Sequence, residues 1–90
     1  MSIVEFTNDN FRVLAYLYDN MDSARLVKIT QQEVSAALGI SRVTINKIFK
    51  QLKDGGYITQ DTSKIGRYHI TDAGVCIVEP FRNSEKKENV

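Results

Sequence analysis

The sequence TQQEVSAALGISRVTINK, residues 30–47, predicts a helix, a tight turn and the start of a second helix. Its first four residues fit a capping box, in which the Thr30 hydroxyl accepts from the Glu33 amide and the Glu33 side chain reaches back to the Thr30 amide. Apolar residues then recur at helical spacing and form a face suited to burial: Val34, Ala37 and Leu38. Gly39 supplies the left-handed residue on which such a helix ends.

A second helix is predicted from Ser41, a favourable N-cap residue, to the pair Gly55-Gly56. Its apolar residues recur as i, i+3, i+4 and i+7, which is the pattern of a core-facing stripe: Ile45, Ile48, Phe49 and Leu52. Only residues 39–41 separate this helix from the one before it. A connection of that length is typical of the turn in a helix-turn-helix.

Beyond the second helix, the sequence predicts a β-hairpin and then a short helix. Residues 57–60 and 67–70 are short strand-like runs, and the polar segment 61–66 between them contains a glycine. The pair Thr71-Asp72 is suited to cap a last short helix, which Pro80 is expected to stop. A third strand is the alternative for this last segment, because its valine and isoleucine residues favour strands.

On the N-terminal side, a first helix should begin near Thr7 or Asn8, which are both good cap residues. Its apolar residues recur at helical spacing: Phe11, Leu14, Ala15, Tyr18 and Met21. Residues 23–29 follow as a loop and a brief strand. The complete order predicts an α+β winged helix-turn-helix, with a three-helix core, a hairpin wing and a short C-terminal helix, over residues 1–82. The polar residues 83–90 are expected to form a disordered tail.

The positive charge of the chain is concentrated in one third of its sequence. The 90 residues have a net charge of only +1. Residues 41–69, however, carry six lysines and arginines against two aspartates, a net charge of +4. The net charges of residues 1–40 and 70–90 are −2 and −1. A local basic patch of this kind is the electrostatic footprint expected for phosphate binding.

Three stretches carry a resemblance to a known family: residues 30–47, Leu52-Lys53-Asp54-Gly55-Gly56-Tyr57-Ile58, and Ile70-Thr71-Asp72-Ala73-Gly74. The first resembles the helix-turn-helix of bacterial winged-helix transcription regulators, and the second resembles their passage into the wing. The third is similar to the step after the wing in MarR-like and PadR-like proteins. Small plasmid or phage DNA-binding adaptors look similar. Ser35 departs from the alanine that is usual in the family, but serine is small enough for close helix approach. The resemblance implies binding of double-stranded DNA.

The polar face of the second helix carries the candidate DNA contacts. In helix-turn-helix proteins, the N-terminal residues of this helix reach base edges in the major groove. We expect base contacts from Arg42, Val43, Thr44, Asn46 and Lys47, and phosphate contacts from Ser41 and Lys50. The resemblance extends DNA contact to Lys64 and Arg67, which flank the tip of the wing. The alternative is that these cations only form a solvated surface.

The sequence holds a single cysteine, Cys76, and a single histidine, His69. One residue of each type cannot build a four-ligand zinc site or an internal disulfide within the chain. Cys76 and His69 lie seven residues apart in different predicted elements, so the sequence indicates no nucleophile–base pair. We therefore expect no metal, no cofactor and no catalytic residue, with Cys76 as a small buried residue and His69 on the surface of a strand. Apolar runs are too short to span a bilayer and no signal peptide is evident, so a cytoplasmic protein without membrane association is expected.

Three functions are consistent with these features. The first is a small homodimeric transcriptional regulator, expected to be a repressor, in which the second copy adds a second half-site. Its candidate dimer interfaces are the last helix and the first helix, where Tyr16 and Leu17 lie off the main stripe. The second is a plasmid or phage partition or replication adaptor, which would also bind a partner protein. The third is a winged helix that contacts only proteins and has no salt-dependent affinity for duplex DNA.

Overall fold

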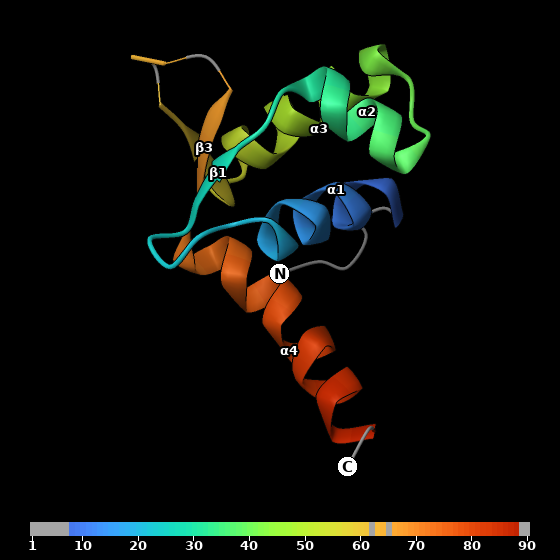
Figure 1. Ribbon diagram of the computed structural model, residues 1–90, viewed down its shortest axis with the longest axis vertical. Coiled ribbons are helices and arrows are strands. Elements are labelled where there is room, and N and C mark those ends of the chain that lie inside the picture. Colours follow the sequence, from blue (N-terminus) through green and yellow to red (C-terminus); the bar gives the residue numbers. More distant parts are fainter. Residues whose placement is uncertain (1–7, 62, 65, 89–90) are drawn as a thin grey trace.

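The computed structural model describes residues 8–61, 63–64 and 66–88. Its elements are α1 (Asn8–Asp19), β1 (Leu26–Lys28), α2 (Gln31–Leu38), α3 (Arg42–Asp54), β2 (Ile58–Gln60), β3 (Arg67–Ile70) and α4 (Asp72–Glu88). The strands form one antiparallel sheet in the order β1-β3-β2. Figure 1 shows α1, α2 and α3 packed together beside the sheet, with α4 extending away from them. The predicted winged helix-turn-helix is confirmed. Thr7, one of the two predicted starts of the first helix, lies outside the described residues.

The predicted capping box forms at the start of α2. The Thr30 hydroxyl accepts from the Glu33 N–H at 3.1 Å, and the Glu33 carboxylate accepts from the Thr30 N–H at 3.1 Å. Gly39 ends the helix in the left-handed conformation, at φ 67°, which favours glycine. The first helix of the pair therefore starts and stops as its sequence predicts.

The turn between α2 and α3 is closed by two serines. The Ser35 hydroxyl donates to the carbonyl oxygen of Ile40, so the departure from alanine at this position adds a hydrogen bond across the turn. Ser41 is the N-cap of α3, and its hydroxyl accepts from the Thr44 N–H at 3.3 Å. The chain thus enters α3 with its direction fixed by local hydrogen bonds.

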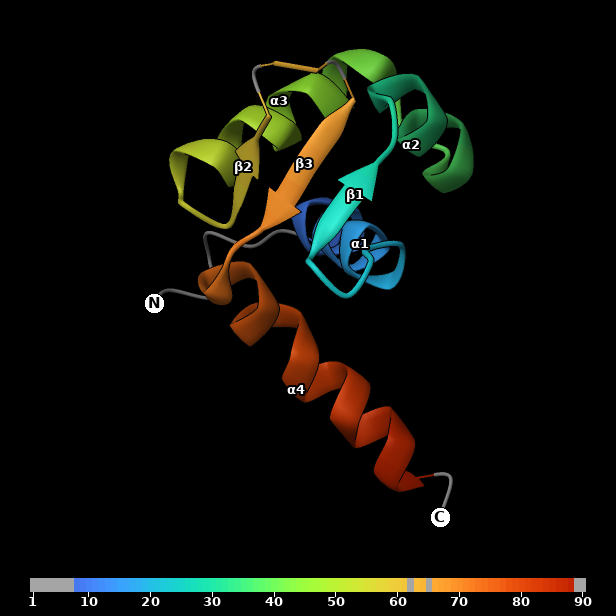
Figure 2. The same cartoon turned by 60° about the vertical axis from the view of Figure 1, so that its left-hand side comes forward.

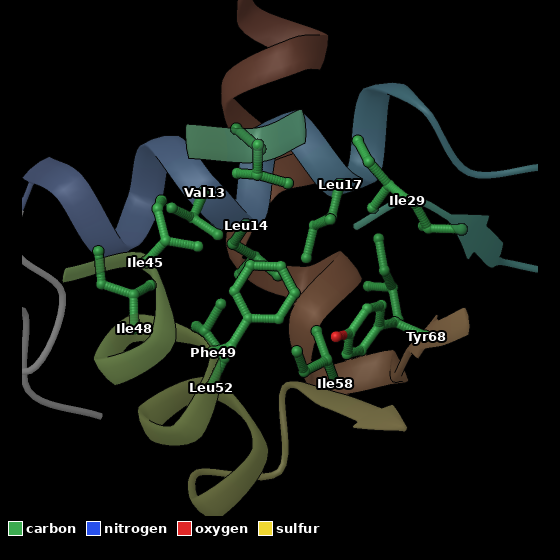
Figure 3. Packing of buried hydrophobic residues seen from close by; sticks show 14 of the residues in the cluster. Val13, Leu14, Leu17, Ile29, Ile45, Ile48, Phe49, Leu52, Ile58 and Tyr68 are labelled. Carbon is green, nitrogen blue, oxygen red and sulfur yellow. The ribbon is translucent and has the colours of Figure 1, made fainter. Parts of the chain in front are cut away.

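The core joins α1, α3 and the sheet, as Figure 3 shows. The predicted stripe of α3 is confirmed because all of its members are buried: Ile45, Ile48, Phe49 and Leu52. The ring of Phe49 meets the ring of Tyr68 in β3 edge to face, with their centroids 4.9 Å apart. Since burial of each large apolar side chain is worth about 1.5–3 kcal/mol, the stripe fixes the rotation of α3 about its own axis.

The buried residues of α1 differ in part from those predicted. Leu14 and Ala15 are buried as expected, but Val13 and Leu17 are also buried and are 0% exposed. The remaining members of the predicted stripe are only partly buried: Phe11, Tyr18 and Met21. The reason is that α1 is covered from several sides, by α2, α3 and α4. Leu17 is therefore closed to a second copy, and its assignment to a dimer interface is wrong.

The hairpin predicted over residues 57–70 is formed by β2 and β3. Ile58 of β2 pairs with Ile70 of β3, and both side chains are buried. Val27 of β1 lies opposite Tyr68 on the other side of β3. His69 is exposed, as predicted, because successive side chains of a strand point to opposite faces.

The last helix is longer than the sequence predicts. α4 runs from Asp72 to Glu88 with Pro80 inside it, so the prediction that Pro80 stops a short helix is wrong. Proline removes the hydrogen bond to the carbonyl group four residues earlier, at Cys76. Because both residues are exposed, solvent can hydrate this side of the helix. Residues 83–88 are helical rather than a disordered tail, and residues 89–90 lie outside the described part.

The prediction that Cys76 is buried is also wrong, because its side chain is exposed. Val75 and Val78 take the inward positions of α4, and Cys76 lies about 100° around the helix from Val75. Further along α4, Phe81 is 57% exposed, and its ring meets the Phe11 ring of α1 edge to face at a centroid distance of 4.9 Å. The apolar run in the sequence therefore alternates between the core and the surface.

α4 starts against the connection between α3 and β2. The Thr71 hydroxyl donates to the Gly56 carbonyl oxygen at 2.6 Å and accepts from the Gly74 N–H at 3.2 Å. The Thr71 N–H donates to the Tyr57 carbonyl oxygen at 3.1 Å. A Cβ atom on Gly74 would overlap with that carbonyl oxygen and lie 2.8 Å from Cγ2 of Ile70. Position 74 therefore requires glycine for close packing.

We expect Gly74→Ala to lower the free energy of unfolding by about 1–3 kcal/mol, because the added methyl group forces the start of α4 away from the sheet. Urea denaturation followed by circular dichroism measures the change. Ala73→Ser, at the exposed neighbouring position, is the control and should have little effect. At an open helical position, glycine to alanine stabilises by about 0.5–1 kcal/mol, and a gain of that size would contradict the packing argument.

Candidate nucleic-acid interface

One face of α3 points away from the core and carries most of the predicted contact residues. Five of them are exposed: Arg42, Val43, Asn46, Lys47 and Lys50. Thr44 is half-buried at the edge of this face, and Val43 is 72% exposed. The arrangement follows from helical geometry, because these positions lie opposite the buried stripe at about 100° per residue. The structure thus brings the predicted residues of α3 together on one surface.

A shallow hollow lies on this surface between α3 and the start of α2. It has a volume of about 560 Å³ and is lined by Gln31, Arg42, Val43, Asn46 and Lys47. The Asn46 side-chain amide donates from Nδ2 to Oε1 of Gln31 at 3.1 Å. Gln31 is not among the residues predicted from sequence. Gln31 is the first residue of α2, and only the packing of α2 against α3 brings it beside Asn46.

The hydroxyl groups at the start of α3 interact with each other. The Ser41 hydroxyl donates to the Thr44 hydroxyl at 2.9 Å, in addition to accepting from the Thr44 N–H. Ser41 is exposed at the N-terminus of the helix, where N–H groups and the helix dipole favour an anion. The geometry is compatible with the predicted phosphate contact of Ser41.

The cationic side chains of α3 differ in whether they bond to other side chains of the domain. Lys53 donates from Nζ to Oε1 of Gln60 at 3.0 Å and so links α3 to β2. Among the residues that the structure describes, Arg42, Lys47 and Lys50 form no salt bridge with an acidic side chain. These three cations therefore leave the exposed face of α3 with positive charge that no paired carboxylate neutralises.

The wing is held by a turn centred on Asp61. Its carboxylate accepts from the Ser63 hydroxyl at 2.6 Å and from the Ser63 N–H at 3.0 Å, and its own N–H donates to the Arg67 carbonyl oxygen at 2.9 Å. Lys64 is exposed and Arg67 is half-buried at the start of β3. Figures 1 and 2 both place the wing loop at the same end of the molecule as α2 and α3, with the distal part of α4 at the other end.

The described residues contain no group of three or more His, Cys, Asp or Glu side chains placed to hold a metal ion. In the same part of the chain, no helix is long and apolar enough to cross a membrane.

Comparisons with known proteins agree with this geometry. Residues 11–74 match the family described as the Crp-like helix-turn-helix domain. This match extends from α1 to the start of α4 and so includes the hollow, the exposed face of α3 and the wing. A comparison with curated protein sequences gives no match.

Solved structures of S. aureus MepR are similar in fold. A MepR mutant bound to an oligodeoxyribonucleotide has a TM-score of 0.69 and 22% identity, and covers 96% of this chain and 62% of that chain. A MepR–DNA complex has a TM-score of 0.69 and 21% identity, and covers 96% of this chain and 61% of that chain. The present chain thus spans less than two thirds of the length of these MepR chains.

The stability of the wing turn should depend on pH through the ionisation of Asp61. The hydroxyl and N–H of Ser63 and the positive charge of Arg67 hold the pKa of Asp61 below its ordinary value. Because the pKa of Asp61 is lower in the folded turn than in the unfolded chain, its ionised form stabilises the folded turn. This stabilisation is fully present above the unfolded-state pKa and is lost as the pH falls through the folded-state pKa.

We expect an NMR titration of the Asp61 carboxyl group to have a midpoint below that of an unfolded chain, with the Ser63 amide signal following the same curve. Asp61→Asn keeps an acceptor oxygen but does not titrate, so the Ser63 signal should lose that transition. A midpoint at or above the unfolded value would show that the carboxylate does not hold the turn.

Proposed function

This chain belongs to the Crp-like helix-turn-helix domain family, and on that premise we propose that it binds double-stranded DNA with α3 in the major groove. The observation that carries the proposal is the exposed face of α3, where an amide, a hydroxyl and an exposed valine lie with three cations that form no salt bridge within the described residues. An α-helix fits the major groove, and these are the chemical groups that read base edges and contact phosphates there. Two solved MepR structures of similar fold contain DNA, which supports DNA binding by this chain.

In this proposal, residues of α3 divide between bases and phosphates. The base contacts come from Arg42, Val43, Thr44, Asn46 and Lys47. Val43 suits the methyl group of thymine, Arg42 the acceptors of guanine, and Asn46 the edge of adenine. Ser41 and Lys50 contact phosphates, and Lys64 and Arg67 place the wing against the backbone or the minor groove.

We further propose that two copies act together as a small transcriptional regulator, and specifically as a repressor. One module of this size reads few base pairs, and a second copy adds both affinity and a fixed half-site spacing. Of the two interfaces considered from the sequence, α4 retains an exposed apolar side chain, Phe81, and projects from the body of the domain (Figure 2). Leu17 of α1 is buried within its own chain.

The test is a selection from random duplex DNA at moderate salt, with the bound sequences read out. Enrichment of a palindrome with half-sites about one helical turn apart would support a dimeric, sequence-reading protein. Enrichment of a single half-site would support DNA reading and contradict the dimer. Absence of binding even at low salt would contradict the function and favour a winged helix that contacts only proteins.

Lys50→Ala should weaken binding to all duplexes to a similar degree, because Lys50 is proposed to contact a phosphate. The slope of log K against log salt is negative and should become less steep by about 1. Fluorescence anisotropy at several salt concentrations measures this slope. Lys86→Ala removes the same charge from the distal part of α4 and serves as the matched control, with an unchanged slope. An unchanged slope for Lys50→Ala would remove this residue from the phosphate contacts.

Asn46→Ala should cost about 1–3 kcal/mol on the preferred duplex and relax the preference at one base position, because Asn46 is proposed to read a base edge. The measurement compares affinities for the preferred duplex and its single-base variants. A uniform loss across all of these duplexes would show that Asn46 does not read a base.

A further inference from the structure

Gln31 has no part in the contacts proposed above, yet it lies in the hollow beside α3. It is the first residue of α2, directly after the N-cap Thr30. Its Oε1 atom accepts from Nδ2 of Asn46 at 3.1 Å, which joins two helices through residues 15 positions apart. Asn46 is proposed to read a base, and Gln31 lies outside α3. The hydrogen bond between them can therefore affect recognition from outside this helix.

The backbone of Gln31 is held firmly enough for a positioning role. The capping box between Thr30 and Glu33 fixes the first turn of α2 by reciprocal hydrogen bonds. Gln31 is half-buried, whereas its neighbour Gln32 is exposed. The backbone at Gln31 is therefore fixed, and its half-buried side chain can adopt fewer conformations than a fully exposed side chain.

The chemistry of the bond suits recognition of adenine. An asparagine side-chain amide has two N–H donors and one acceptor oxygen. Adenine presents one acceptor, N7, and one donor, N6–H₂, in the major groove. When one N–H of Asn46 donates to Gln31, the other N–H and Oδ1 remain to complement that edge. With Oε1 of Gln31 as the acceptor, Nδ2 is the end of the Asn46 amide that faces Gln31.

We propose that Gln31 is a positioning residue that orients the Asn46 amide and thereby sets the base preference of α3. This inference rests on the proposed function, since it concerns the same DNA-reading surface. Gln31 acts through Asn46 and needs no contact with a base. Its loss leaves the Asn46 amide free to rotate, so the amide can present its donor or its acceptor to either base of a pair.

The experiment uses the full chain with duplexes from a random pool, and then single-base variants of the duplex that the unmodified protein enriches. Gln31→Ala should reduce the discrimination between the preferred base and the others by about 3- to 10-fold at the position read by Asn46, and little elsewhere. Gln31→Glu keeps an acceptor for the Asn46 N–H, so it should restore the preference at this position while binding all duplexes more weakly through its added negative charge. Gln32→Ala is the matched control on the same turn of α2 and should leave the preference unchanged.

A double-mutant cycle separates positioning from general stability. If Gln31 acts through Asn46, Gln31→Ala should add nothing to the loss of discrimination in Asn46→Ala. Circular dichroism and thermal unfolding of each variant verify that the domain stays folded. Additive effects, or an equal loss on every duplex with Gln31→Ala, would overturn the inference while leaving DNA binding intact. No binding of any duplex by the unmodified protein would instead overturn the proposed function, and this inference with it.

Discussion

The burial of one apolar stripe of α3 is the constraint on which the rest of the structure depends. Ile45, Ile48, Phe49 and Leu52 pack into the core, and Phe49 meets Tyr68 of the sheet. Because a helix is rigid, this packing also decides which residues point outward. The same hydrophobic term that stabilises the domain therefore orients the amide, the hydroxyl and the cations of the opposite face. Substitutions in the core would change recognition by turning the helix, even where they touch no ligand.

The charged residues are not distributed evenly along the chain, and the packing of the core does not explain where they lie. The chain as a whole is almost neutral, but residues 41–69, which contain α3 and the wing, have a net charge of +4. Lys53 belongs to this basic segment and yet serves the fold, since its ammonium group joins α3 to Gln60. Arg42, Lys47 and Lys50, by contrast, form no salt bridge within the part of the chain that the structure describes, so their charges face solvent. The net charge of the chain does not reveal this difference between Lys53 and the other three cations.

Local sequence signals predicted much of the fold and most of the candidate site. The capping box at Thr30, the left-handed Gly39 and the α3 stripe act within a few residues of each other, and all three are present. Features set by distant packing were not predictable in this way. The exposure of Cys76 depends on which face of α4 meets α1 and the sheet, and the continuation of α4 past Pro80 depends on a solvated outer side. Gln31 was missed because its bond to Asn46 exists only at the crossing of two helices.

The order of the sheet has a consequence for how the domain assembles. β1 precedes the helix pair and β3 follows it, so the pairing of Val27 with Tyr68 closes a long loop that contains both helices. Such non-local contacts form late and slowly, because the entropy of loop closure is lost before they stabilise the chain. The stripe of α3 gains Tyr68 as a packing partner only from β3, so α2 and α3 alone lack part of the surface that buries them. Pairing of β1 with β3 is therefore the step that completes the core around α3 and holds its exposed face in place.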